Sequence, residues 1–229
     1  MLTAYIDESG HEGKGWMFLA GWVGDCSQWK HFADEWRKGL GPQRKSLHMT
    51  DLRWNRDRTR VLLERLGPIP ERCHLQGIMG GVRYGDYEDL VVGTPHAKEL
   101  KGYMSCLMPM VAQTLKGIPR DERIELVFEQ QNEYEPFVNM ALPTFTVPDR
   151  HAPYHMMPDG KPKLAKWSFV PKGTTILTDP ADYLTFALRE VWTDQKSKKA
   201  KWCRSIFKSR TWDRIRQNYD AKRGSLRNN

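Results

Sequence analysis

Carboxylates occur at three places in this sequence where a predicted strand ends or a predicted helix begins. Asp7 and Glu8 follow an apolar run over residues 2–6, and Glu129 is the last residue of the apolar pattern IELVFE. Asp182 lies in TDPADYLTFAL, a segment typical of the first turn of a helix. Two carboxylates about 4 Å apart repel by roughly 4 kcal/mol at an effective dielectric constant of about 20, so converging acids need protons or cations. An all-carboxylate site prefers Mg²⁺ or Mn²⁺, and such ions can promote hydrolysis of a phosphodiester bond.

Each of these acids also has an ordinary structural interpretation. Asp7 and Glu8 could simply start a turn, and Glu129 could emerge into water at the end of its strand. Asp182 suits the positive end of a helix dipole. We assign the nearby Asp179 to the N-cap of the same helix, because a proline follows it at the first helical position.

Strand alternation separates the roles of Asp7 and Glu8. Successive side chains of a strand point to opposite faces, so Asp7 shares a face with Tyr5, whereas Glu8 shares the other face with Ile6. Asp7 is therefore the first choice for a metal ligand. Glu8 is a second choice, because it would need local twist of the strand to join the same site.

Hydrophobic periodicity and turn residues predict an alternation of strands and helices. The first two strands should form an antiparallel hairpin, because glycines separate them. Strands are predicted over residues 2–6, 16–23, 74–84, 124–129 and 166–170, and helices over 29–40, 95–115 and 180–192, with a charged helix ending near residue 66. This order is not a run of βαβ units, so it predicts an α/β fold with a mixed sheet and helices on its faces.

Charge divides the chain into two parts. The 229 residues are 39% hydrophobic and include nine tryptophans, enough for one large domain. Of the 36 Lys and Arg residues 12 lie between Lys196 and Arg227, together with 2 of the 28 acidic residues. That segment therefore carries +10 and the remainder about −2 of the net +8. We expect a domain over residues 1–195 and a basic C-terminal extension over 196–229.

The basic extension predicts an arm that binds a polyanion, with nucleic acid as the leading candidate. A solvated helix or a flexible end would explain the same composition equally well. The candidate contacts to nucleic acid are Lys198, Lys199, Lys201, Arg204, Lys208 and Arg210.

Membrane and zinc functions are not favoured. No apolar run approaches the roughly 20 residues of a membrane span and no signal peptide precedes the first strand, so we expect a cytoplasmic protein without a membrane partner. The four cysteines form no CxxC pair, which is typical of free thiols in a reducing compartment. His151 and His155 have a metal-like spacing, but Pro153 disfavours the helix that would align their rings.

Several segments together resemble the domain-of-unknown-function 3800 family. The chain has YIDESG near its start, an apolar hairpin strand after it, LHMTDL at residues 47–52, an acid-ended strand at residue 129 and ADYLTFAL near residue 185. The family typically has YIDESG near its start and a helix similar to LQLADLIAYAL near its end. The resemblance covers roughly residues 3–192, and YIDESG is its most specific part.

This resemblance implies a ribonuclease H-like fold, a five-stranded mixed sheet whose central first strand carries a metal-binding aspartate. It also implies a nuclease dependent on Mg²⁺ or Mn²⁺, of a kind linked with phage defence or mobile elements. By position, Asp7 and Glu8 match the acids of YIDESG, and Asp182 matches the acid of the late helix. With Glu129 these are the expected catalytic acids, and all but Glu8 are expected metal ligands. Residues 178–180 depart from the family pattern, as does Glu129, where Asp is more usual.

Further residues leave alternatives open. His48, in LHMTDL, could carry a proton or contact substrate, because its pKa would lie near neutrality, or it could be a structural histidine. The irregular TDPAD segment and Glu129 would also suit a nucleic-acid-binding module without catalysis. Trp202 and Trp212 would suit a protein partner, because aromatic residues are enriched at interfaces, and the chain would then be active only in a complex.

Overall fold

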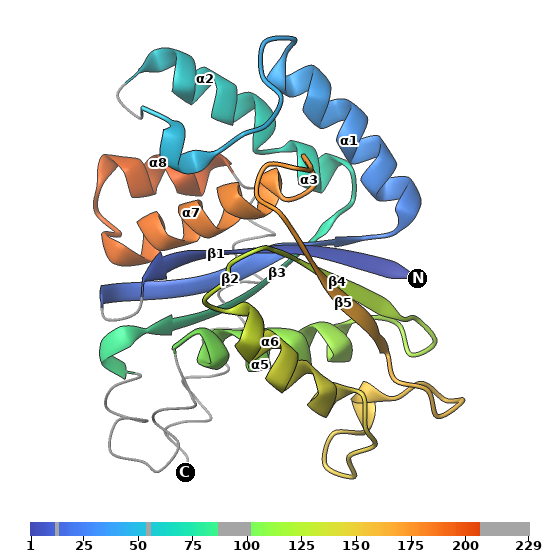
Figure 1. The fold of residues 1–229 in the computed structure, drawn as a ribbon. Coiled ribbons are helices and arrows are strands. Elements are labelled where there is room, and N and C mark those ends of the chain that lie inside the picture. The colour runs from blue at the N-terminus through green and yellow to red at the C-terminus, as the bar shows by residue number, and fades with distance from the viewer. Residues whose placement is uncertain (12–13, 54–55, 87–101, 207–229) are drawn as a thin grey trace.

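The computed structural model describes residues 1–11, 14–53, 56–86 and 102–206. Five strands form one mixed sheet in the order β3-β2-β1-β4-β5 (Figure 1). They are β1 (Leu2–His11), β2 (Lys14–Gly24), β3 (Gln76–Arg83), β4 (Ile124–Glu129) and β5 (Leu164–Val170). The central strand β1 pairs antiparallel with β2 and parallel with β4. The predicted α/β class with a mixed sheet is confirmed.

Helices cover both faces of this sheet (Figure 1). One layer contains α1 (Cys26–Leu40), α2 (Asp57–Leu66), α3 (Ile69–Arg72), α7 (Asp179–Thr193) and α8 (Lys198–Ile206). The other contains α5 (Gly102–Gly117) and α6 (Glu135–Ala141). Short 3-10 turns occur at Met49–Asp51, Leu142–Phe145 and Pro153–His155. The predicted segment 95–101 of the long helix lies outside the described residues.

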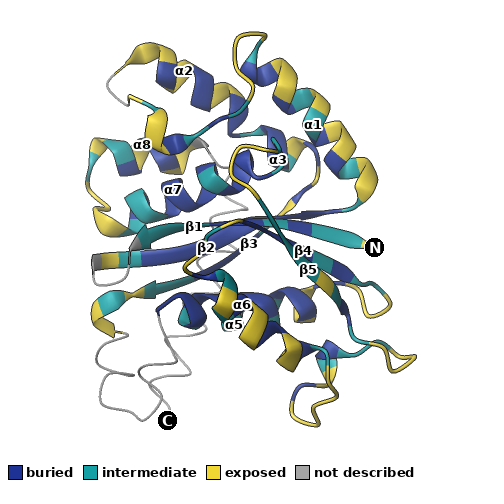
Figure 2. Ribbon diagram, in the orientation of Figure 1, coloured by how far each residue is buried: buried dark blue, intermediate teal, exposed yellow. Residues whose placement is uncertain are grey.

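Each layer buries its own apolar core against the sheet, while the outer sides of the helices stay exposed (Figure 2). Trp22, Trp36 and Tyr183 are buried in the core under α1 and α7, whereas Ile6 and Phe128 are buried in the core under α5. The division of strand side chains between the two cores follows their alternation along each strand. Side chains of β1 that share the face of Tyr5 therefore point toward α7.

Local signals explain how two of the elements are placed. Asp25 caps α1 in a capping box, because its carboxylate accepts from the backbone N–H of Gln28 and the Gln28 side chain accepts from the backbone N–H of Asp25. Gly80 in β3 permits close approach of α5, since a Cβ there would lie 2.1 Å from the carbonyl oxygen of Cys106.

The first part of the basic extension belongs to the helical layer. Ala200 and Cys203 of α8 are buried in the same core as α7, and the indole of Trp202 donates a hydrogen bond to Glu64 of α2 at 3.0 Å. Residues 198–206 are therefore packed against the expected domain, and residues 207–229 lie outside the described part of the chain. Among the described helices, none has the length and apolar character needed to cross a membrane.

Candidate active site

The central strand carries two acids past the point where its parallel neighbour ends. Ile6, opposite Phe128, is the last residue of β1 that pairs with β4. Asp7 and Glu8 keep their pairing with β2, which carries the strand to His11, beyond the predicted end at residue 6. The acids therefore lie at the carboxyl end of β4, and ligands of open α/β sheets bind beside the carboxyl ends of parallel strands.

Burial and mutual repulsion disfavour the charged forms of both acids. Asp7 is only 4% exposed, and its pKa is raised well above the ordinary value by burial, then by Glu8, Asp182 and Glu129. The pKa of Glu8 is raised to about 8, by burial and then by Glu129, with Lys172 acting in the opposite direction. Both acids are thus within electrostatic reach of the other predicted acids.

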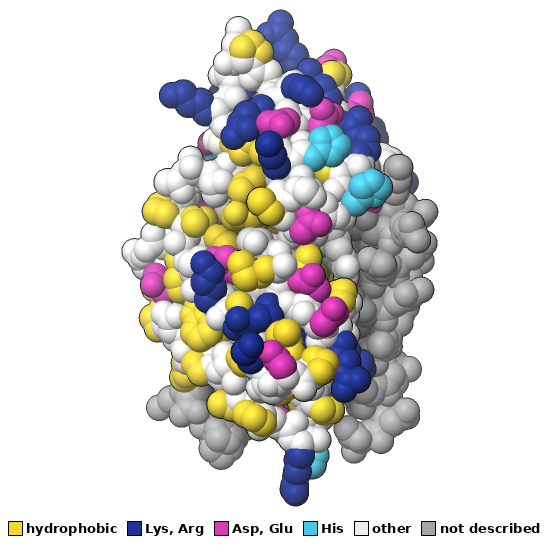
Figure 3. Space-filling model, turned by 90° about the vertical axis from the view of Figure 1, so that its right-hand side faces the viewer, with side chains coloured by type: hydrophobic (Ala, Val, Ile, Leu, Met, Phe, Trp, Pro, Cys, Tyr) yellow, Lys and Arg dark blue, Asp and Glu magenta, His cyan; other side chains and the backbone are white. Residues whose placement is uncertain are grey.

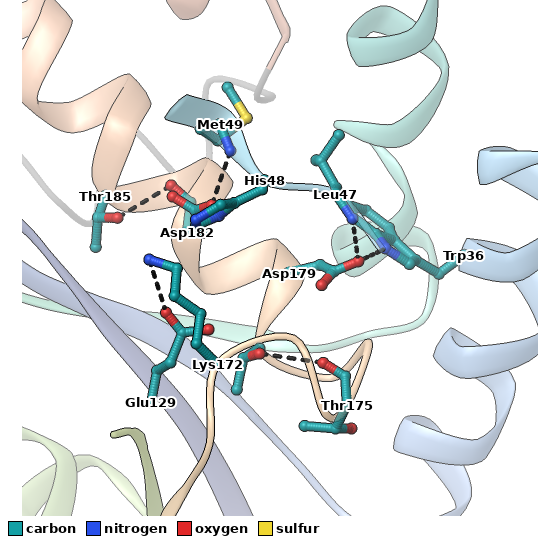
Figure 4. Close-up of polar contacts among 11 residues, drawn as sticks. Trp36, Leu47, His48, Met49, Glu129, Lys172, Thr175, Asp179, Asp182 and Thr185 are labelled. Carbon is teal, nitrogen blue, oxygen red and sulfur yellow. Dashed lines mark hydrogen bonds and ion pairs between the residues drawn. The ribbon is translucent and has the colours of Figure 1, made fainter. Parts of the chain in front are cut away.

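Glu129 is buried rather than emerging into water at the end of β4. It is 7% exposed, and its Oε2 accepts no hydrogen bond from the described residues. The Nζ of Lys172, in the loop after β5, lies 3.4 Å from that oxygen (Figure 4). Lys172 is half exposed, so this ion pair is partly screened by water.

Asp182, in the first turn of α7, binds the segment that contains His48. Its Oδ2 accepts from the backbone N–H of Met49 at 2.9 Å and lies 2.8 Å from Nδ1 of His48 (Figure 4). An ionised carboxylate can only accept, so this contact requires the proton on Nδ1 and leaves Nε2 of a neutral ring as the acceptor. Oδ1 of Asp182 accepts no hydrogen bond from the described residues, so that oxygen is available to a ligand.

Asp179 does not cap α7, and its predicted assignment is wrong. The N-cap position is Thr178, without a side-chain cap. The Oδ2 of Asp179 instead accepts from the indole N–H of Trp36 at 3.0 Å and from the backbone N–H of Leu47 at 2.8 Å (Figure 4). Burial raises the pKa of Asp179 to about 7, although these two hydrogen bonds act against the shift.

Two carboxylates one helical turn apart therefore hold residues 47–49 against the start of α7. Asp179 binds Leu47, and Asp182 binds His48 and Met49. Sequence reasoning missed the role of Asp179, although the i, i+3 spacing of two acids in TDPAD was visible. It also missed Lys172, which lies in a loop with no recognisable motif.

The chemistry of the cluster fits a hard divalent cation. Carboxylate oxygens are the preferred ligands of Mg²⁺ and Mn²⁺, and the buried Oε2 of Glu129, which accepts no hydrogen bond from the described residues, is such an oxygen. Burial and the neighbouring acids raise the pKa values of Asp7 and Glu8, and a bound cation would favour their charged forms. No three His, Cys, Asp or Glu side chains within the described ranges are arranged as a set of metal ligands. The acids would therefore have to adjust their rotamers to bind an ion.

The residues predicted to contact nucleic acid differ in their exposure and in their interactions. Lys198, Lys201 and Arg204 are exposed on α8. Lys199 forms an ion pair with Glu190 at 3.0 Å, and its Nζ lies 4.6 Å from the ring centroid of Phe186. The other two predicted contacts, Lys208 and Arg210, lie outside the described residues.

The histidine pair in HAPYH does not form a metal site. His155 is 5% exposed and packs edge-on against the rings of Phe145 and Tyr154, whereas His151 is exposed and accepts from Nε of Arg150. Burial lowers the pKa of His155, which fits a neutral ring in an apolar setting.

A scan of the chain against models of known protein families finds no match, and neither does a search of the curated proteins.

Proposed function

We propose that this protein is a nuclease that depends on Mg²⁺ or Mn²⁺ and hydrolyses phosphodiester bonds of DNA or RNA. The observation that carries the proposal is the group of Asp7, Glu8, Glu129 and Asp182, of which Asp7 and Glu129 are buried, gathered at the carboxyl end of β4, where the carboxyl groups act electrostatically on one another. Carboxyl groups this close repel one another when they are ionised, so divalent cations would stabilise their charged forms.

The sheet gives the proposal a second support. It has five strands, it is mixed, β1 is its central strand, and β1 carries Asp7. The ribonuclease H-like fold, and with it a role in phage defence or mobile elements, is what the resemblance of YIDESG and ADYLTFAL implies. Both are part of the proposal.

Each residue of the site has a chemical task in this proposal. Asp7, Glu129 and the Oδ1 of Asp182 would hold the cations, which supply a Lewis acid and an activated water. Nε2 of His48 is free to take or give a proton, because Nδ1 is engaged by Asp182. Asp179 positions the His48 segment through Leu47. Glu8 adds negative charge beside the ligands.

The test is a cleavage assay with single- and double-stranded DNA, RNA and hybrids, in Mg²⁺ or Mn²⁺. We expect Asp7→Asn to lower the cleavage rate by at least about 100-fold, because even residues that only support metal ligands affect activity by roughly 10- to 100-fold. Asp121→Asn makes the same chemical change at an exposed turn before β4 and should cleave like the parent. Equal cleavage by the parent and Asp7→Asn would refute the assignment of the site.

One observation favours a nucleic-acid-binding module without catalysis as the alternative. Lys172 already supplies a positive charge beside Glu129, at 3.4 Å, and lowers the pKa of Glu8. If Lys172 replaces the metal, titration calorimetry should detect no Mg²⁺ or Mn²⁺ binding in the parent protein. Metal binding that appears only in Lys172→Met, together with oligonucleotide binding but no cleavage by the parent, would establish this alternative.

A further inference from the structure

A basic groove lies on the layer of α1, apart from the exposed cations of α8. A cavity of about 430 Å³ is lined by Arg37 and Lys38 at the end of α1, by Arg44 and Lys45 in the following loop, and by Ile176. A second cavity of about 590 Å³ shares Arg37 and Ile176 with the first and adds Lys30, Thr174 and Thr175. The two cavities form one groove between α1 and the loop that leads into α7.

The charge of this groove is not neutralised by its own lining, which contains no acidic residue. Arg37 and Lys38 have partners on the same helix, Asp34 at 3.5 Å and Glu35 at 2.9 Å, and both pairs are solvent-exposed. Arg44 and Lys45 are exposed and form no ion pair with the described residues. At the upper end of the face shown in Figure 3, Lys and Arg side chains lie among Asp and Glu side chains.

Two short segments connect the lining of the groove to residues at the start of α7. Leu47, which donates to Asp179, follows Lys45 by two residues, and Ile176 precedes Asp179 by three. A chain residue spans at most about 3.6 Å, so both walls of the groove come within about 11 Å of the start of α7. A strand bound along the groove would therefore pass close to the start of α7, where Asp182 lies in the first turn.

We propose that this groove binds the phosphodiester backbone of a nucleic acid and directs it to the acids at the start of α7. Lys and Arg side chains contact phosphates without reading sequence, and they position the strand. The threonines of the second cavity add hydroxyl groups that can donate to phosphate oxygens. The identity of the polyanion as nucleic acid rests on the proposed function.

The test measures binding of labelled single- and double-stranded oligonucleotides by fluorescence anisotropy, with the full chain and with EDTA to prevent cleavage. Arg44→Gln combined with Lys45→Gln should weaken binding and reduce the slope of log affinity against log salt by roughly 1.4–1.8, the value for two lost phosphate contacts. Lys116→Gln combined with Arg120→Gln removes the same charges from exposed positions at the end of α5 and beyond it, and should leave the slope unchanged.

Equal slopes for the groove variant and the parent would overturn the proposal, as would a parent that binds no oligonucleotide. Inorganic phosphate that binds the parent as tightly as an oligonucleotide does would assign the groove to a small anion instead and also overturn it. Cleavage measured in parallel separates the two proposals. If oligonucleotide binding requires Arg44 and Lys45 but no cleavage is detected, only the groove proposal is supported. If the protein cleaves but its binding does not depend on these two residues, only the nuclease proposal is supported.

Discussion

The carboxyl groups of Asp7 and Glu8 in β1 lie where an ionised acid is unfavourable. Asp7 is almost fully buried, and the pKa of Glu8 is raised to about 8 by burial and by Glu129. A folded protein that keeps such groups must balance them with protons, with Lys172 or with a bound cation. Strongly shifted pKa values are typical of functional sites, so these acids form a candidate functional site.

The raised pKa of Glu8 predicts how stability depends on pH. Its folded pKa of about 8 lies above the ordinary 4.5, so the folded state binds the proton more tightly than the unfolded state. This contribution to stability is full below about pH 4.5 and is lost as the pH rises through 8, with an upper limit of about 5 kcal/mol. Glu8→Gln should therefore stabilise the metal-free protein increasingly as the pH rises, measured by thermal unfolding in EDTA.

A matched variant separates this effect from general charge removal. Glu135→Gln deletes a carboxylate from the first turn of α6, on the other face of the sheet, and should show no growing difference from the parent. A difference in melting temperature between Glu8→Gln and the parent that stays constant or shrinks from about pH 5 to 8 would contradict the shifted pKa.

At the scale of elements, the start of α7 joins segments that are far apart in the sequence. Asp179 binds Trp36 of α1 and the backbone of Leu47, across 143 and 132 residues. The helix itself was predictable from the apolar pattern of residues 180–192. The hydrogen-bond partners of Asp179 were not predictable, because a carboxylate beside a proline can either cap a helix or accept hydrogen bonds from residues far away in the sequence.

Two substitutions at Asp179 distinguish its hydrogen bonds from its charge. Asp179→Ala should lower the free energy of unfolding by about 2–4 kcal/mol, because it leaves the indole N–H of Trp36 and the amide of Leu47 without an acceptor. Asp179→Asn keeps an acceptor oxygen and removes the charge, so it should retain most of the stability. Urea unfolding above pH 7 measures the free energy of unfolding of both variants. An equal decrease of this free energy in the two variants would contradict the positioning role of Asp179.

At the scale of the whole molecule, the sequence predicted the class of fold better than the distribution of charge. Alternating patterns predicted the mixed sheet because β1, β2 and β4 are buried against both layers. The positive charge was expected in the C-terminal extension, yet a basic groove follows α1 and the loop after it. Composition detects a run of cations, whereas only the fold brings Lys30, Arg37 and Arg44 into one groove.

The acids lie at the carboxyl end of β4, and the basic groove is lined by residues close in sequence to the start of α7. A nucleic acid could be held by the cations of the groove while the acids hold the divalent ions. Metal binding should then release protons from Asp7 and Glu8, so Mg²⁺ should raise the melting temperature more at pH 8 than at pH 6.

The most direct test is a crystal of the protein soaked in Mn²⁺ and measured at the manganese absorption edge. We predict an anomalous peak in contact with Asp7 and with Glu129 or Asp182, lost in crystals of Asp7→Asn. A well-ordered acid cluster without a peak, or with the Nζ of Lys172 in that place, would contradict the account.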